Sequence, residues 1–187
     1  MKIQVLGCDP SLRNWGLALG ELDLVTGEFS KLQLRVITPK EETSKQVRKN
    51  SKDLELAELL VQGILPWVGM CQVIFVETPV GSKSARAMAS YGICVGVLGS
   101  LRASGKQLIE VSASEVKMAI AGKKTATKDQ MITAAIRIYP EANWPIYRGK
   151  PASTSEHLAD AIGTIHAGVR TPIFKNLMNI LQGKTTT

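Results

Sequence analysis

The chain has 187 residues, 44% of them hydrophobic and 21% charged, a composition typical of folded globular proteins and unlike that of disordered or fibrous chains. This length suits one domain with a sizeable core, which we expect over residues 1–182, followed by a flexible tail over residues 183–187. Lysine and arginine total 23 against 16 acidic residues, a net charge of +7, and this basic balance favours a polyanionic partner.

Signals for a membrane or for secretion are absent from the sequence. No apolar run approaches the roughly 18 residues of a membrane helix, and the first apolar run stops at Asp9, where a secretory signal would continue. The cysteines Cys8, Cys71 and Cys94 are far apart, odd in number and set in apolar runs. This pattern predicts reduced core thiols in a cytoplasmic protein with no membrane partner.

Positive charge concentrates in two stretches, residues 102–128 and the segment from Lys40 to Lys52. Each is compatible with a solvated face or with a contact to a polyanion. Aromatic residues make up 5% of the chain, which does not favour an extended base-stacking platform for single strands.

The first third of the chain predicts three strands. Residues 2–9 are a buried strand that ends at Asp9, and residues 15–21 and 29–37 are two more strands joined by a turn at Thr26-Gly27.

A helix and a central strand follow. Residues 39–52 predict a loop or a frayed helix start, and residues 53–68 have the apolar spacing of a helix, which we expect Pro66 to end. Residues 71–77 are a continuous apolar run that closes on Glu77, the pattern of a strand buried on both faces.

The remaining residues predict mainly helices. Glycines at 92, 96 and 99 would line one face of the first of these helices and allow close packing, and Thr127 and Gln130 have the spacing of a capping box. Residues 140–155 are interpreted as a polar connection. The predicted helices are 82–105, 112–122 ending at a glycine, 127–139, 155–170 and 172–182, with a short strand over 106–112. The chain therefore predicts a mixed α/β sheet of about five strands with helices on both faces.

Asp9 and Glu77 stand at the ends of two buried strands. Burying a charge there is costly unless it is paired or holds a metal ion. The alternative is that both begin turns, Asp9 with Pro10 and Ser11, and Glu77 before a Thr-Pro pair. If the two strands lie side by side, the carboxylates converge at one end of the sheet.

A third carboxylate, Asp160, lies on a predicted helix among apolar neighbours, where an unpaired acid is rarely left. His157 precedes it by three residues and shares its face. Glu156 shares that face too, but Ser153 and Glu156 have capping-box spacing. We therefore favour His157 as the ligand or acid–base group, with Glu156 as second choice. His166 lies among small apolar residues and is interpreted as structural.

Without a cation, three carboxylates gathered with an imidazole in a small volume would repel one another. Two divalent cations would neutralise them, and could activate water and stabilise a phosphoryl leaving group. Oxygen ligands suit Mg²⁺, and the imidazole leaves room for Mn²⁺.

Four motifs carry a family resemblance. They are GCDPSLRNWG at 7–16, VIFVETP at 73–79, VSASEVKMAIAGKKTATKDQM at 111–131 and EHLADAIGTIHA at 156–167. In this order they resemble the RuvC family of Holliday-junction resolvases, which have an RNase H-like fold, over about residues 2–169. The third motif is the most specific, whereas the first also resembles the opening of actin-like ATPases.

The resemblance implies a homodimeric endonuclease that binds four-way DNA junctions and nicks two strands of like polarity symmetrically. Each subunit would hold a divalent metal site, with two Mg²⁺ ions and no nucleotide cofactor. Asp9, Glu77 and Asp160 match the family's metal-binding acids, and His157 matches a fourth position that is acidic or histidine. The protein would work in a bacterial cytoplasm, or in the host cytoplasm if a phage encodes it.

The resemblance also implies which basic residues meet DNA. Lys117 and Lys128 match positions near the scissile phosphate, although without the motif both would be interpreted as a solvated helix surface. The expected DNA-binding residues are Lys83, Arg86, Lys117, Lys123, Lys124 and Lys128.

Two segments depart from the family pattern. Family members can carry an aromatic residue shortly after the acid matched by Glu77 to open the junction, but here Val80 stands near that position and the first aromatic is Tyr91. The segment AGKKTATK is more basic than the expected Gly-x-Gly turn, which implies extra phosphate contacts.

Other functions stay open at this point. An actin-like ATPase or kinase would need a second glycine-rich phosphate loop and usually a longer chain. A non-catalytic nucleic-acid-binding module would be expected to lack one of the four site residues. A less selective nuclease that cuts forks and flaps fits the missing aromatic.

Overall fold

The computed structural model describes residues 1–40 and 48–181. The predicted tail over 183–187, and residues 41–47 of the basic stretch from Lys40 to Lys52, lie outside the described residues.

Within these ranges, five strands form one mixed sheet: β1 (Lys2–Asp9), β2 (Trp15–Asp23), β3 (Phe29–Ile37), β4 (Val73–Glu77) and β5 (Gln107–Val111). Their order across the sheet is β3-β2-β1-β4-β5. β1 and β3 run antiparallel to β2, whereas β4 runs parallel to both β1 and β5. The predicted mixed sheet of five strands is confirmed, and β4 is a buried interior strand between β1 and β5.

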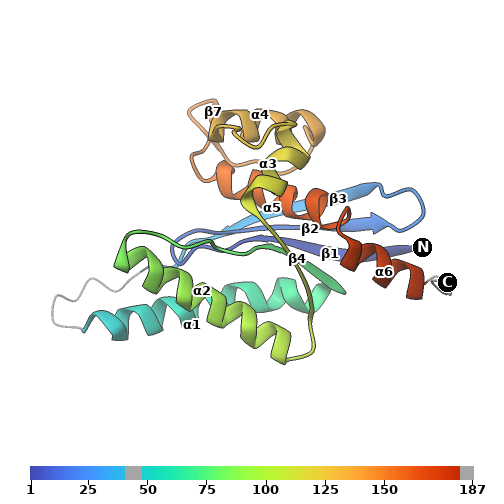
Figure 1. The fold of residues 1–187 in the computed structure, drawn as a ribbon. Coiled ribbons are helices and arrows are strands. Elements are labelled where there is room, and N and C mark those ends of the chain that lie inside the picture. Colours follow the sequence, from blue (N-terminus) through green and yellow to red (C-terminus); the bar gives the residue numbers. More distant parts are fainter. Residues whose placement is uncertain (41–47, 182–187) are drawn as a thin grey trace.

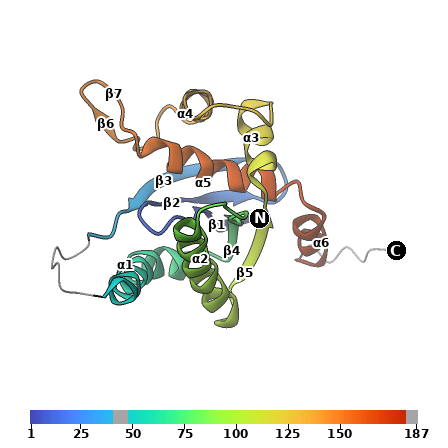
Figure 2. The ribbon, with the colours of Figure 1, turned by 60° about the vertical axis from the view of Figure 1, so that its left-hand side comes forward.

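Six helices in the described part of the chain cover the two faces of this sheet: α1 (Lys49–Met70), α2 (Ala85–Ala103), α3 (Ala113–Ala121), α4 (Lys128–Ile138), α5 (Ser155–Gly168) and α6 (Pro172–Leu181). Figures 1 and 2 show α1 and α2 on one face and α3, α4 and α5 on the other. α5 lies between the sheet and the α3–α4 pair, so it is buried almost all round. None of the described helices has the length and hydropathy that a membrane crossing requires.

Strand alternation decides which side chains meet which layer. On β1, Val5 packs in the core beneath α5, whereas Leu6 and Cys8 pack in the core shared with α1 and α2. On β4, Phe75 faces α5 and Ile74 faces the opposite layer. Odd-numbered positions of both strands therefore point toward α5.

α5 lies directly against the backbone of β1 and β2 because glycines stand beneath it. A Cβ atom on Gly7 would lie 2.0 Å from the carbonyl oxygen of Ala161, and one on Gly16 would lie 2.1 Å from the carbonyl oxygen of His157. No real Cβ could occupy either position unless the helix moved away.

The local signals at helix ends are confirmed for α3 and α4. Ser112 and Glu115 form a capping box at the start of α3, which ends at Gly122 with a left-handed φ of 73°. Thr127 and Gln130 form the predicted capping box of α4.

The expectation that Pro66 ends its helix is wrong, because α1 continues to Met70. Pro66 lies on the exposed side of the helix, where solvent can hydrate the carbonyl that lacks its donor. Ile64 and Val68 are buried on either side of it, and their packing holds the last turn on the sheet.

The three α2 glycines line one face of the helix, as expected, but no other part of the described chain packs closely against them. Gly92, Gly96 and Gly99 are exposed, and a Cβ atom on any of them would meet no atom of the described chain within 4 Å. The buried face of α2 is the opposite one, which carries Cys94 and Leu98.

The segment between α4 and α5 is more ordered than the predicted connection. It contains a hairpin of β6 (Ile146–Tyr147) and β7 (Lys150–Pro151), whose two-residue strands are too short to show alternation in a sequence. Ahead of it, the Asn143 side chain accepts the backbone N–H of Leu34 at 2.8 Å and donates to its carbonyl at 2.9 Å. The segment is thereby fixed to the outer edge of β3.

We expect Gly7→Ala to destabilise the protein by roughly 2 kcal/mol or more, because the added methyl group would force α5 away from β1. Denaturant unfolding measures this. Gly69→Ala in α1 is the matched control, since a Cβ there meets no described atom within 4 Å, and it should leave stability unchanged or raise it by up to about 1 kcal/mol, because alanine is the better helix former. Equal stability of the two variants would contradict the close docking of α5.

Candidate active site

Asp9 and Glu77 come together at one end of the sheet. Cys8 pairs with Val76 in the parallel register of β1 and β4, so the next residue of each strand is a carboxylate. Both follow the alternation that points Gly7 and Phe75 toward α5. The predicted convergence of these two acids is confirmed as geometry.

α5 brings His157 and Asp160 to the same end. His157 Nδ1 donates a hydrogen bond to Asp9 Oδ2 at 2.6 Å, across 148 positions of sequence. Both side chains are mostly buried. Because Asp160 follows His157 by three residues, it lies on the same helix face, and its pKa responds to the charges of Asp9 and His157.

Glu156 also belongs to this cluster, and its predicted role in a capping box with Ser153 is wrong. The N-cap residue of α5 is Thr154, with no side-chain cap hydrogen bond. Glu156 is thus left to contact its neighbours. Its Oε2 lies 2.5 Å from Lys128 Nζ, and its Oε1 lies 3.6 Å from His157 Nε2.

Two lysines approach from the layer above α5. Lys128 begins α4 and forms the ion pair with Glu156, which raises the pKa of Lys128. Lys117 lies on α3, and its positive charge acts on both Glu77 and Asp160 by lowering their pKa values. Residues of the motifs at 111–131 and 156–167 therefore lie around Asp9 and Glu77, the acids of the motifs at 7–16 and 73–79.

The acids resist full ionisation. Burial raises the pKa of Glu77 to about 7, and the charges of Asp9 and Asp160 act in the same direction. Burial and the charge of Asp9 raise the pKa of Asp160 to about 7 as well. Burial lowers the pKa of His157, but the hydrogen bond to Asp9 and the negative charges of Asp9, Glu156 and Asp160 together outweigh burial, so the pKa ends above its usual value. Near neutral pH these two buried carboxylates are therefore only partly ionised, and an added positive charge would favour their ionised forms.

Three carboxylates and one imidazole are ligands of the kind that hard divalent cations prefer. Buried carboxylates with raised pKa values are stabilised by a positive charge, and carboxylate oxygens with one imidazole suit Mg²⁺ or Mn²⁺. In the described residues, no three His, Cys, Asp or Glu side chains stand close enough together to hold a metal ion. Ligation would require these side chains to turn toward one another.

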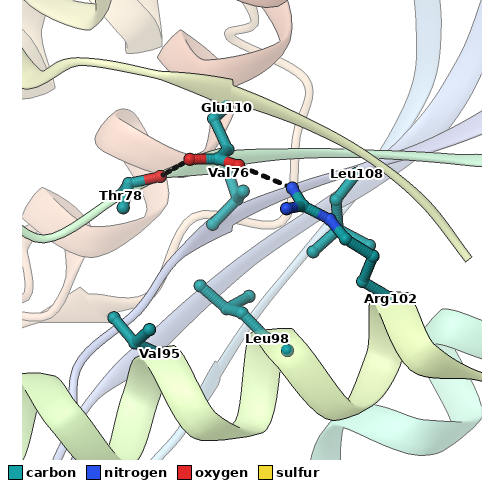
Figure 3. Close-up of a pocket in the computed structure, with 8 residues that line it drawn as sticks. Val76, Thr78, Val95, Leu98, Arg102, Leu108 and Glu110 are labelled. Atoms are coloured by element: carbon teal, nitrogen blue, oxygen red, sulfur yellow. Dashed lines mark hydrogen bonds and ion pairs between the residues drawn. The ribbon is translucent and has the colours of Figure 1, made fainter.

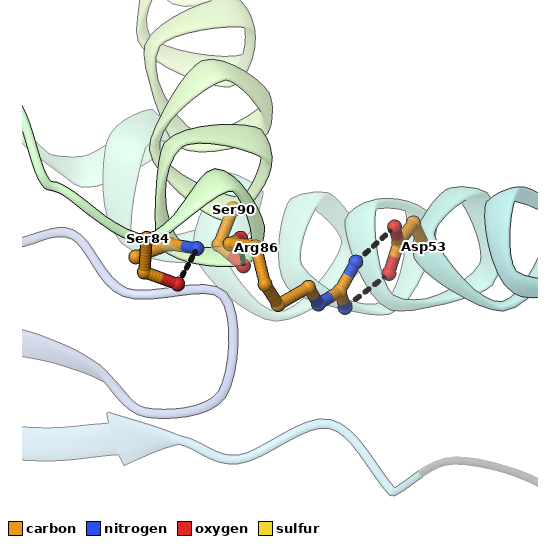
Figure 4. A network of polar contacts seen from close by, with 5 residues as sticks. Asp53, Ser84, Arg86 and Ser90 are labelled. Atoms are coloured by element: carbon orange, nitrogen blue, oxygen red, sulfur yellow. Dashed lines mark hydrogen bonds and ion pairs between the residues drawn. The ribbon is translucent and has the colours of Figure 1, made fainter.

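The expected DNA-binding residues differ in whether their side chains are exposed to solvent or already paired within the fold. Lys83, Lys123 and Lys124 are exposed. Arg86 instead forms a two-point ion pair with Asp53, at 2.5 and 2.6 Å, which ties the start of α2 to α1 (Figure 4). Its guanidinium therefore already serves a contact within the fold.

The three cysteines and His166, which the sequence predicts to be structural, do not take part in the acid cluster. Cys8, Cys71 and Cys94 are buried and unpaired, as predicted. His166 lies 2.7 Å from the Tyr139 hydroxyl, and burial lowers its pKa to about 4. It is therefore a neutral core histidine at physiological pH.

A separate cavity of about 100 Å³ lies on the other face of the sheet, between α2 and strands β4 and β5 (Figure 3). Its two charged lining residues, Arg102 and Glu110, form an ion pair at 2.6 Å, and Thr78 donates to Glu110. These groups satisfy one another, and the sheet separates the cavity from the acid cluster.

Three solved structures are similar to the chain along nearly its whole length. A Thermus thermophilus RuvC in complex with Holliday junction substrate has a TM-score of 0.59 and 18% identity, with 97% of each chain covered. A second Thermus thermophilus RuvC structure has a TM-score of 0.55 and 18% identity, with 98% of each chain covered. The yeast mitochondrial Holliday junction resolvase Ydc2 has a TM-score of 0.56 and 12% identity, covering 95% of this chain and 83% of its own.

The fold is RNase H-like. No protein-family model and no curated protein matches the sequence. At 12% to 18% identity the structural likeness establishes the shared fold, and the activity has to be inferred from the side chains of the site.

Glu77→Gln should change how stability depends on pH in metal-free buffer. Since folding raises the pKa of Glu77 from 4.5 to about 7, the folded state keeps a proton that the unfolded state has lost. The free energy of unfolding of the wild type therefore falls as pH rises through this window. We expect Glu77→Gln to flatten the fall and to be more stable at pH 8 by roughly 1–3 kcal/mol.

Urea unfolding at several pH values in EDTA measures this effect. Glu28→Gln, on the exposed β2–β3 turn, is the matched control and should keep the wild-type slope. A Glu77→Gln variant less stable than wild type at pH 8 would show that Glu77 is not held in a strained environment.

Proposed function

We propose that the chain is a metal-dependent endonuclease that resolves four-way DNA junctions by paired symmetric nicks. The observation that carries the proposal is the meeting of three carboxylates, a histidine and two lysines at one end of the sheet. Asp9, Glu77, Asp160 and His157 come from three separate elements, and a hydrogen bond of 2.6 Å joins two of them. The fold is the one found in RuvC with a Holliday junction substrate, which supports this use of the site.

Asp9, Glu77 and Asp160 would hold two Mg²⁺ ions, with His157 as fourth ligand and Glu156 as second choice; Mn²⁺ is a substitute. Such ions would supply charge neutralisation and an activated water for phosphodiester hydrolysis. His157 orients Asp9 through its hydrogen bond. Lys117, whose charge already acts on Glu77 and Asp160, would stabilise negative charge that builds on the phosphate.

The DNA would follow the basic residues around this site. Lys83 lies on the segment after β4, and Lys123, Lys124 and Lys128 lie around the α3–α4 turn. Lys128 is shared with Glu156, so we assign the free phosphate contacts to the exposed Lys83, Lys123 and Lys124. A net charge of +7 makes binding dependent on salt. Residues 1–182 would form a single nuclease domain.

A homodimer would match the two-fold symmetry of paired nicks. The outer face of α2 supports it, because Gly92, Gly96 and Gly99 leave an open surface beside the exposed side chain of Val95. A second copy could approach the helix backbone closely there.

A less selective branched-DNA nuclease is the second candidate. The observation in its favour is the segment after Glu77, where Val80 is 70% exposed and an aromatic side chain is missing before Tyr91. The actin-like ATPase alternative is weaker, since the described fold resembles resolvases over nearly its whole length.

We expect wild-type protein with Mg²⁺ to nick a synthetic four-way junction symmetrically, to cut a three-way fork less, and to leave linear duplex intact. Asp9→Asn should lower the cutting rate on the order of 100-fold or more, because it removes one negative charge from the site, while DNA binding is retained. Gel assays with end-labelled strands measure both. Equal cutting of linear duplex would exclude the resolvase, and preferred cutting of the fork would favour the second candidate.

The same assay separates the roles of the lysines. Lys117→Ala should slow cutting more than it weakens binding, whereas Lys123→Ala and Lys124→Ala should weaken binding and its salt dependence. Lys175→Ala, on α6 at the other end of the molecule (Figure 1), is the control and should change neither. A Lys117→Ala variant that binds DNA more weakly but cuts bound DNA at the wild-type rate would show that Lys117 only contacts the DNA backbone.

Light scattering tests the dimer. We expect a mass of about twice the 20.2 kDa chain for the wild type, and a lower mass for Gly96→Arg, whose side chain would block close approach of a second α2. Gly69→Arg on α1 is the matched control and should remain dimeric. A monomeric wild type at concentrations where it cuts junctions would exclude the dimer.

A further inference from the structure

We propose that the β6–β7 hairpin is a DNA contact whose Tyr147 ring stacks on an unpaired base next to the candidate active site. This inference rests on the proposed function, and it describes how the protein would recognise a DNA branch point next to the candidate site. The segment matched none of the motifs, and it was expected to be a plain connection.

The β6–β7 hairpin is held by backbone hydrogen bonds between its two strands and at its base. Ile146 pairs with Pro151 and Tyr147 with Lys150, and Ala152 donates its N–H to the Pro145 carbonyl at 2.8 Å.

Its base is tied to the core. Asn143 binds the edge of β3 through two hydrogen bonds. The Trp144 indole packs against the core beneath α5 and donates to the Tyr139 carbonyl at 2.8 Å. The tip is therefore presented from an anchored frame.

The side chains of the hairpin serve no core. Ile146 is 62% exposed and Tyr147 is 64% exposed, although a two-stranded hairpin alone is marginally stable in water. Arg148 adopts a left-handed φ of 50° ahead of Gly149 at 74°, a turn type in which Asn-Gly is usual. The left-handed turn position strains the backbone of Arg148, and the exposed Ile146 and Tyr147 contribute little burial to the fold, which points to use in binding.

The chemistry of the tip suits a nucleic acid. The Arg148 guanidinium lies 5.2 Å from the centroid of the Tyr147 ring, and one ring can stack on a base while Arg148 and Lys150 meet phosphates. Residues 142–155 contain no acidic side chain, so the charges of the segment are the two positive ones of Arg148 and Lys150. A purely apolar protein partner would not use this charge.

The hairpin leads straight into the candidate site. Pro151 ends β7 four residues before Ser155 begins α5, whose first turn carries Glu156 and His157. Figures 1 and 2 both show the hairpin projecting at the end of the molecule where α5 begins. A strand with its phosphate at the acid cluster would therefore pass close to Tyr147, and a base at the branch point, where the continuous stack is interrupted, is the one most easily unpaired to stack on the ring.

The test uses full-length protein in EDTA, where no strand is cut, and a four-way junction with 2-aminopurine at the branch. Base stacking on an aromatic ring changes the fluorescence of this probe. We expect Tyr147→Ala to remove the change and to weaken junction binding roughly tenfold, while binding to linear duplex stays within about twofold. Tyr147→Phe keeps a ring and should behave as wild type. Arg148→Asn, which tolerates the left-handed turn, should weaken binding with the fluorescence change retained.

Val25→Ala is the matched control, since Val25 is exposed on the β2–β3 turn at the opposite end. A Tyr147→Ala variant with wild-type junction binding and fluorescence would overturn the inference, while junction cutting by the wild type in Mg²⁺ would leave the proposed function standing. Equal weakening on junction and duplex would also overturn base stacking. A wild type that neither binds nor cuts branched DNA would instead overturn the proposed function.

Discussion

The contact between α5 and the bare backbone of β1 and β2 is the constraint on which the candidate site depends. Because Gly7 and Gly16 have no side chains, the carbonyl oxygens of Ala161 and His157 occupy the space where Cβ atoms would stand. The helix is thereby lowered until His157 reaches Asp9 at 2.6 Å. Lifting the helix by even one methyl group would stretch that hydrogen bond beyond its useful range.

The site that results is unfavourable for folding alone. Buried carboxylates with pKa values near 7, at Glu77 and Asp160, are groups that a fold selected only for stability would replace by apolar residues. Lys117 and His157 relieve only part of the repulsion. Such local conflicts between stability and side-chain choice are expected where a protein binds a charged ligand.

Much of this arrangement could be predicted from sequence, because it follows from short-range rules. A continuous apolar run indicates a buried strand, so Glu77 could be placed at a strand end beside Asp9 once the two strands were assumed to be neighbours. The errors arose where tertiary packing overrides local preference. The helix continues past Pro66 because the sheet holds its last turn. Glu156 was expected to cap its own helix, since spacing alone cannot reveal a lysine from another element.

The side chain of Asn143 imitates a neighbouring strand, satisfying both backbone groups of Leu34 on the outer side of β3. An unprotected edge strand invites edge-to-edge pairing and aggregation between copies. The Asn143 side-chain amide blocks such pairing at Leu34, in the middle of β3. Self-association of the chain is consequently directed away from continuous intermolecular sheets through β3 and toward contacts between helices.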